Sequence, residues 1–88
     1  MIEMEELEEK YEELKKNKVK EIWEVSILDT KKGTRRLDFA LVDNQIEAVE
    51  KAKEFKEKLN SCNEVVVALM VYENGKFDET FGRILYRK

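Results

Sequence analysis

Apolar positions at the start of the chain recur at the spacing of one helical face. Met4, Leu7, Tyr11 and Leu14 follow one another at intervals of three, four and three residues, and this periodicity predicts an amphipathic helix over residues 1–17. Glutamates crowd its first part and lysines its end, which complements the helix dipole. Two heptads are too few for an independent coiled coil, so we expect the helix to pack on the rest of the domain or on a partner.

Residues 19–42 alternate between apolar and polar positions, as a β-hairpin does. From Trp23 to Ile27 every second residue is apolar, and Glu24 and Ser26 occupy the other face of the strand. A turn that contains a glycine follows, and the alternation then resumes. A period of two is the pattern of half-buried strands.

Residues 43–60 predict a second helix. Asp43 or Asn44 is a suitable N-cap, and Asn44 and Glu47 have the spacing of a capping box. The residues that we expect to form the buried stripe of this helix, broadened by Ala48, are Ile46, Val49, Ala52, Phe55 and Leu59.

Residues 64–88 predict a second hairpin. Residues 64–72 are apolar on both faces and rich in β-branched side chains, which is typical of a buried strand. Asn74-Gly75 suits a type I′ turn. The last strand alternates less regularly, and we expect Gly82 to mark a bulge.

The element order αββαββ indicates an α+β domain that spans residues 1–88. We expect a four-stranded antiparallel sheet with both helices packed on one face. A ferredoxin-like plait whose first strand is moved to the C-terminus has this element order. The comparison is topological and carries no function.

Such a permuted plait conflicts with the composition of residues 64–72. The plait places this segment at a sheet edge, where a strand that is apolar on both faces is an aggregation hazard. Either the strand order differs and the segment is central, or the sheet meets another molecule, as in a homodimer. The continuous apolar run favours the central position.

Composition favours a folded cytoplasmic domain. Hydrophobic residues make up 42% of the chain and the net charge is only −3, so the composition does not indicate disorder. The single cysteine, Cys62, excludes an internal disulfide framework. The acidic start, MIEMEELEEK, differs from the basic and then apolar start of a signal peptide. Apolar runs fall well short of the roughly 20 residues that cross a bilayer, so we expect no membrane association.

The residue types that commonly perform catalysis are scarce. Histidine is absent, which removes the side chain most used as a general base near neutral pH. Cys62 therefore has no histidine to activate it, and a zinc site would lack ligands. The three glycines are scattered, so no phosphate-binding loop is expected. We predict no enzyme activity, no catalytic residues, no metal site and no cofactor.

Two charged surfaces are candidate binding sites. An acidic ridge on the first helix would bind a basic protein surface, and this favours a small protein-binding regulator or inhibitor, of the kind that phages and plasmids encode. A solvated outer helix face is the simpler interpretation of the same pattern. The glutamates of the ridge are Glu5, Glu8, Glu9, Glu12 and Glu13.

A nucleic-acid-binding module is the alternative, although the overall acidity of the chain, with a pI of about 5.1, speaks against it. Its candidate phosphate contacts are Lys31, Lys32, Arg35, Arg36, Arg83 and Arg87. A homo-oligomeric structural subunit is the third hypothesis. For an interface on an open sheet face the candidates are Met70, Tyr72 and Tyr86.

Overall fold

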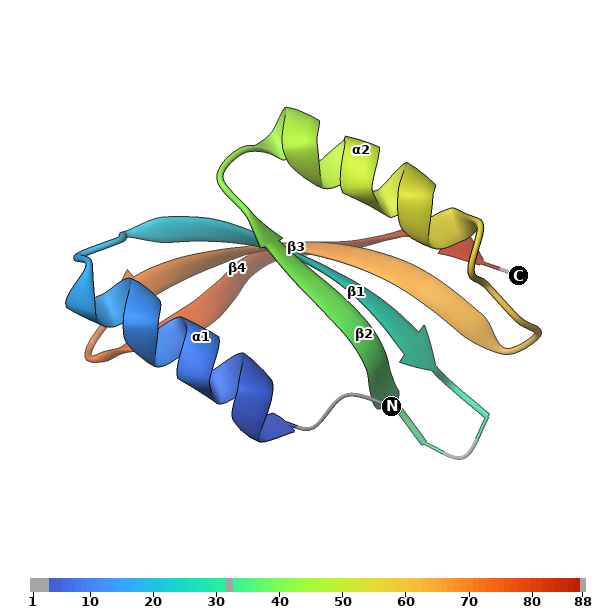
Figure 1. Ribbon diagram of the computed structural model, residues 1–88, viewed down its shortest axis with the longest axis horizontal. Coiled ribbons are helices and arrows are strands. Elements are labelled where there is room, and N and C mark those ends of the chain that lie inside the picture. The colour runs from blue at the N-terminus through green and yellow to red at the C-terminus, as the bar shows by residue number, and fades with distance from the viewer. Residues whose placement is uncertain (1–3, 32, 88) are drawn as a thin grey trace.

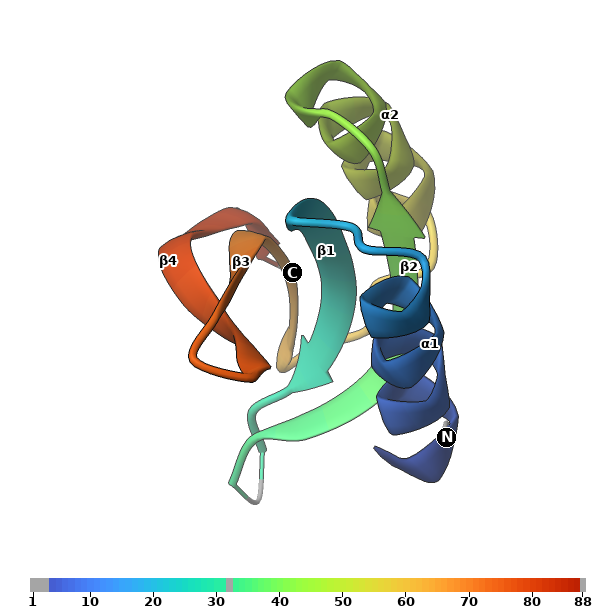
Figure 2. The ribbon, with the colours of Figure 1, turned by 90° about the vertical axis from the view of Figure 1, so that its left-hand side faces the viewer.

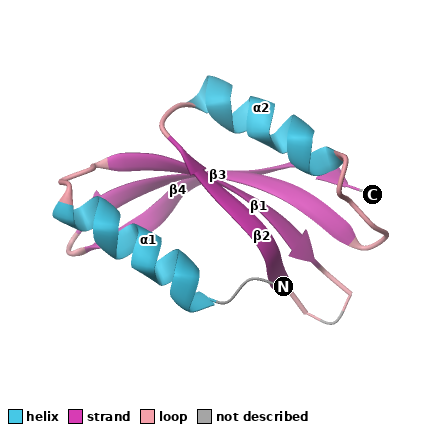
Figure 3. Cartoon of the chain, viewed as in Figure 1, coloured by secondary structure: helices cyan, strands magenta, loops and turns pink. Residues whose placement is uncertain are grey.

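The computed structural model describes residues 4–31 and 33–87 and has the element order αββαββ (Figure 1). The helices and strands follow one another in the order that the sequence predicts (Figure 3). The elements are α1 (Met4–Lys16), β1 (Glu21–Asp29), β2 (Arg35–Val42), α2 (Gln45–Lys56), β3 (Asn63–Glu73) and β4 (Lys76–Arg87). The predicted α+β class is confirmed. The first three residues of the expected helix 1–17 lie outside the described residues.

The four strands form one antiparallel sheet in the order β2-β1-β3-β4. Figure 2 shows β4, β3, β1 and β2 from left to right. The apolar segment over residues 64–72 therefore lies in a central strand, β3, as its composition favours. A permuted plait would place this strand at an edge, so that version of the fold is wrong. The edge strands are β2 and β4.

One face of the sheet, which we call the α2 face, carries the main core. Val25 lies opposite Val67, and Ile27 opposite Val65, across the β1–β3 pair. The residues packed on them are Ala48, Ala52 and Phe55 of α2 and Leu59 of the turn that follows it. Because two of these four residues are alanines, the helix can approach the sheet closely and bury the valines completely.

The helix α1 lies on the opposite face, which we call the α1 face. Its Tyr11 side chain reaches Glu24, and Glu24 and Val25 are neighbours in β1, so their side chains point to opposite faces. In Figure 1 the strands run between α2, at the top, and α1, at the lower left. The expectation that both helices pack on one face is therefore wrong. Strand β3 is apolar on both faces, and β1 places Ile22 beside Glu24 on the α1 face, so each face needs a cover.

Helix α2 begins where the sequence predicts and ends earlier. The Asn44 side chain accepts a hydrogen bond of 2.9 Å from the Glu47 amide, so Asn44 is the N-cap. The helix ends at Lys56 instead of residue 60, because the next residues form a tighter turn in which each amide bonds three residues back. Ile46, expected in the buried stripe, is 74% exposed, because the helical rotation points it away from the side of α2 that carries the buried Ala48 and Ala52.

The β3–β4 turn matches the sequence, but the bulges do not. Asn74 and Gly75 have φ angles of 53° and 85°, as a type I′ turn requires, so this prediction is confirmed. Gly82 pairs regularly with Ala68, and its expected bulge is absent. The register shifts instead leave Thr80 and Leu85 unpaired, and bulges of this kind disrupt the pairing capacity of an edge strand.

Two α2 substitutions test how the helix is buried. Phe55→Ala should lower the free energy of unfolding by about 3–5 kcal/mol, because it leaves a cavity in the core. Ile46→Ala should change the same quantity by less than about 0.5 kcal/mol, because the side chain is exposed. Urea unfolding followed by circular dichroism measures both values. Similar losses for the two variants would contradict the placement of Ile46.

Candidate functional site

The five glutamates of the predicted ridge are all exposed on α1. Their spacing places them on one side of the helix, and they line one continuous stretch of surface together with Lys16. Leu7, on the side toward the sheet, is only 4% exposed. Within the group, Glu12 pairs with Lys15 at 2.9 Å. We call this surface the acidic stripe; its members are Glu5, Glu8, Glu9, Glu12 and Glu13.

The candidate phosphate contacts are divided between different environments. Lys31 and Arg35 lie at the exposed tip of the first hairpin, at the same end of the sheet as Arg87. Arg87 pairs with Glu64 at 2.9 Å, and Arg36 is held by a buried glutamate. Arg83 lies on the α2 face, away from the tip, and Lys32 lies outside the described residues. The described members of the set do not form one phosphate-binding surface.

The three candidate interface residues also separate. Tyr72 and Met70 lie on the α1 face, where the Tyr72 ring packs at 5.4 Å from the Phe77 ring. Tyr86 packs against the core under α2, with the Lys56 ammonium 4.9 Å from its ring centroid. All three are half-buried, and no open face carries them together.

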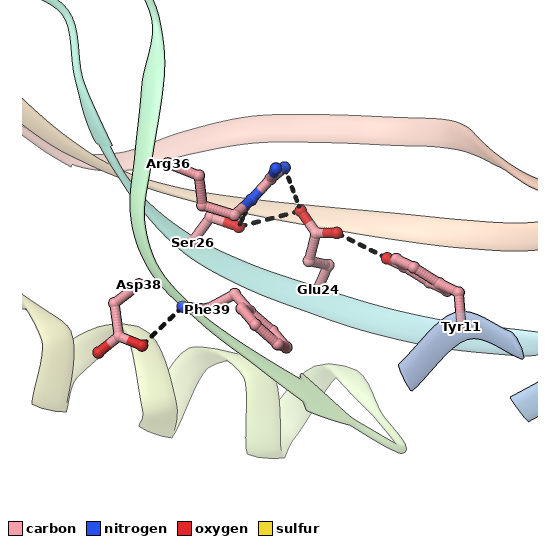
Figure 4. Close-up of polar contacts among 6 residues, drawn as sticks. All are labelled: Tyr11, Glu24, Ser26, Arg36, Asp38 and Phe39. Carbon is pink, nitrogen blue, oxygen red and sulfur yellow. Dashed lines mark hydrogen bonds and ion pairs between the residues drawn. The ribbon is translucent and has the colours of Figure 1, made fainter. Parts of the chain in front are cut away.

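A buried polar cluster connects α1 to the sheet (Figure 4). The Tyr11 hydroxyl donates to Glu24 Oε1 at 2.6 Å, and the Ser26 hydroxyl donates to Oε2 at 2.9 Å. Arg36 Nη2 donates to the same Oε2 at 3.0 Å. Arg36 Nε also donates to Ser26 Oγ at 3.3 Å. Residues of α1, β1 and β2 thus converge on one buried carboxylate.

The cluster is built for attachment and is poorly suited to proton transfer. Burial raises the pKa of the Tyr11 hydroxyl far above its usual range, and the charge and hydrogen bond of Glu24 raise it further, while Arg36 acts in the opposite direction. Such a hydroxyl keeps its proton at neutral pH. Among the described residues, every buried side-chain nitrogen and oxygen has a hydrogen-bond partner, so the cluster presents no unsatisfied group to a ligand.

An aromatic groove on the α2 face is the feature that the sequence interpretation missed. The Trp23 and Phe81 rings meet edge to face at 6.4 Å, and the adjoining cleft has a volume of about 90 Å³. We call it the Trp23 groove; its main lining residues are Trp23, Gln45, Val49, Phe81, Arg83 and Leu85. Trp23 shares its face of β1 with the buried Val25 and Ile27, but it is itself only half-buried. The signal that could have revealed it is the long, irregular last strand.

The described part of the chain carries neither a cluster of metal ligands nor a helix that could span a membrane. Over residues 4–31 and 33–87, no three His, Cys, Asp or Glu side chains form a group that could hold a metal ion. In the same ranges no helix has the length and apolar character that a bilayer crossing requires.

Comparisons with protein-family models, with curated proteins and with solved structures found no match to this chain. What the chain does must therefore be inferred from its own geometry.

Two arginine–glutamate pairs of similar length allow a matched test of the buried cluster. Arg36→Leu leaves the Glu24 carboxylate buried without its cation, and the free energy of unfolding should fall by about 3–5 kcal/mol. Arg87→Leu breaks a pair in which the arginine side chain is 65% exposed, and the loss should be at most about 1 kcal/mol. Chemical unfolding of both variants measures the difference. Equal losses would contradict the structural role of the Arg36–Glu24 pair.

Alkaline pH tests the Tyr11 hydrogen bond. Since the pKa of Tyr11 is higher in the folded state, the folded protein keeps a proton that the unfolded chain releases above about pH 10. Stability should therefore be intact below this pH and fall above it, by up to about 1.4 kcal/mol per pH unit from this group. Tyr11→Phe should remove that part of the slope. An unchanged slope, measured by denaturant unfolding at several pH values, would show that Tyr11 titrates normally.

Proposed function

We propose that this chain is a non-enzymatic protein-binding regulator that presents the acidic stripe of α1 to a basic surface on another protein. The observation that carries the proposal is the division of α1 into two faces. Leu7 and Tyr11 attach one face to the sheet, and the five glutamates of the stripe occupy exposed positions. A cytoplasmic location is part of the proposal.

The attachment of α1 supports this function because it fixes the spacing of the glutamates before binding. An isolated helix of this length would be marginal in water, and a partner would have to order it at a cost in affinity. The Tyr11–Glu24 hydrogen bond and the burial of Leu7 order α1 when the chain folds, so a partner does not have to order it on binding. The stripe is therefore preorganised as a row of carboxylates on a rigid support.

The charge of the stripe indicates which partners it selects. Clustered like charges steer association with a surface of opposite sign and repel surfaces of the same sign. The glutamates outnumber the lysines along the stripe, since only Lys16 lines this surface with them. A basic groove, of the kind that binds phosphates, has the complementary potential. The proposed regulator would occupy such a groove in place of its usual anionic ligand.

Affinity capture from a cell lysate, with and without nuclease, separates this proposal from the two alternatives. A stoichiometric protein that survives nuclease supports the regulator. Capture that depends on nucleic acid supports the basic residues at the hairpin tip, Lys31 and Arg35, together with Arg87. Self-association in light scattering, with no captured partner, supports the homo-oligomeric subunit.

Charge reversal tests the stripe directly. The triple variant Glu8→Lys, Glu9→Lys and Glu12→Lys should lose partner binding by at least about a hundredfold, because attraction becomes repulsion, and it should keep its circular dichroism spectrum.

A matched control reverses three exposed glutamates on the other side of the sheet, two in α2 and one at its C-cap: Glu50→Lys, Glu54→Lys and Glu57→Lys. This variant should bind as the original chain does. Comparable losses of partner binding in the two triple variants would show that net charge alone causes the effect. Unchanged binding in the α1 variant would refute the role of the stripe.

A further inference from the structure

We propose that the Trp23 groove is a second binding surface, and that it takes a short acidic peptide segment of another protein with one large apolar side chain. The groove lies on the α2 face, and the acidic stripe lies on the helix that covers the opposite face. The proposal therefore does not depend on the proposed function of the stripe.

The groove exists because α2 covers only part of its face of the sheet. Trp23, Leu69 and Phe81 lie opposite one another across β1, β3 and β4. Helix α2 packs on the neighbouring residues closer to the other end of these strands, such as Val25 and Val65. The row that contains the two aromatic rings is left at the margin of the helix, with Phe81 49% exposed.

The size of the cleft indicates a side chain as its occupant. Pockets for small-molecule ligands usually enclose roughly 300–1,000 Å³, and this cleft has about 90 Å³. An apolar cavity of about 150 Å³ holds a benzene ring, so this smaller cleft suits an aliphatic side chain such as leucine. A shallower hollow continues from it past Val49 to the exposed Ile46, which gives room for the residues that flank an anchoring side chain.

The charges beside the rings select an acidic segment. Arg83 lines the cleft with Trp23 and Phe81, and Lys53 lines the adjoining hollow. Neither side chain forms an ion pair with any described residue, whereas Arg36 and Arg87 each bind a glutamate. A guanidinium beside aromatic rings binds a carboxylate through two parallel hydrogen bonds. Glu50 also lines the hollow, so the preference for a carboxylate is centred on Arg83.

A second copy of the chain fits the groove less well than a peptide does. Continuous pairing of two β4 edges would extend the sheet, but the bulges at Thr80 and Leu85 interrupt the regular strand on both sides of Phe81 and Arg83. Trp, Phe and Arg side chains gathered around a small cleft are instead the composition of a binding hot spot. A short segment that contacts only this stretch avoids both bulges.

The experiment uses the full chain and short synthetic peptides that carry one central leucine flanked by glutamates. Trp23 is the only tryptophan of the chain, so its fluorescence reports binding at the groove. The leucine–glutamate peptide should bind with a Kd below about 1 mM. Replacing its leucine with serine, or its glutamates with glutamines, should weaken binding by about tenfold or more, because each change removes one of the two recognised groups.

Charge exchange identifies the residue that recognises the carboxylate. Arg83→Glu should weaken binding of the glutamate peptide by about tenfold or more. The same variant should bind the corresponding lysine peptide more tightly than the original chain does. Lys76→Glu, the same charge reversal in the same exposed strand but beside the turn, is the control and should leave both affinities unchanged. Phe81→Ala should weaken the binding of every peptide that carries leucine.

Three results of the peptide measurements would overturn the proposal. They are the absence of any peptide binding below about 1 mM, equal affinities for the glutamate and glutamine peptides, and equal effects of the Arg83 and Lys76 reversals. A dimer that forms without peptide and dissociates in Arg83→Glu would also overturn it, because the occupant would then be a second copy.

Discussion

The structure depends on a constraint set by its two central strands, β1 and β3, which have to be covered on both faces. Valines of both strands are buried under α2 on one face, and on the other face Ile22 and Ala68 are buried as well. A four-stranded sheet with both helices on one side would expose that second face to water. Placing α1 there solves the problem, and it also separates the acidic stripe from the Trp23 groove.

The second face is covered in a different way from the first. Helix α2 approaches the sheet through alanines, whereas α1 is held at a greater distance by larger side chains such as Tyr11 and by a buried carboxylate. A hydrogen bond to a charged group is stronger than one between neutral groups, but it depends on geometry. The Glu24 cluster therefore specifies where α1 sits, while apolar burial under α2 supplies most of the stability.

Local chemistry made much of the fold predictable. Asn44 and Asn74-Gly75 determine a cap and a turn through their own backbone preferences, and the apolar run of β3 indicated a central strand. The face chosen by α1 and the convergence on Glu24 depend on contacts between distant segments, which periodicity does not encode, whereas the exposure of Ile46 follows from its position around α2 relative to Ala48 and Ala52. The acidic stripe follows from the spacing of the glutamates along one helix. The Trp23 groove depends on how much of the sheet α2 covers, which the sequence pattern does not show.

The placement of the two helices on opposite faces is the central claim, and proton–proton NMR contacts of the Tyr11 ring test it most directly. The rings of Tyr11 and Phe77 have centroids 5.2 Å apart, so strong cross-peaks between them should appear. Cross-peaks of the Tyr11 ring with the side chains of Phe55, in α2, and of Val25, beneath α2, should be absent. The reverse pattern would place both helices on one face and contradict the account.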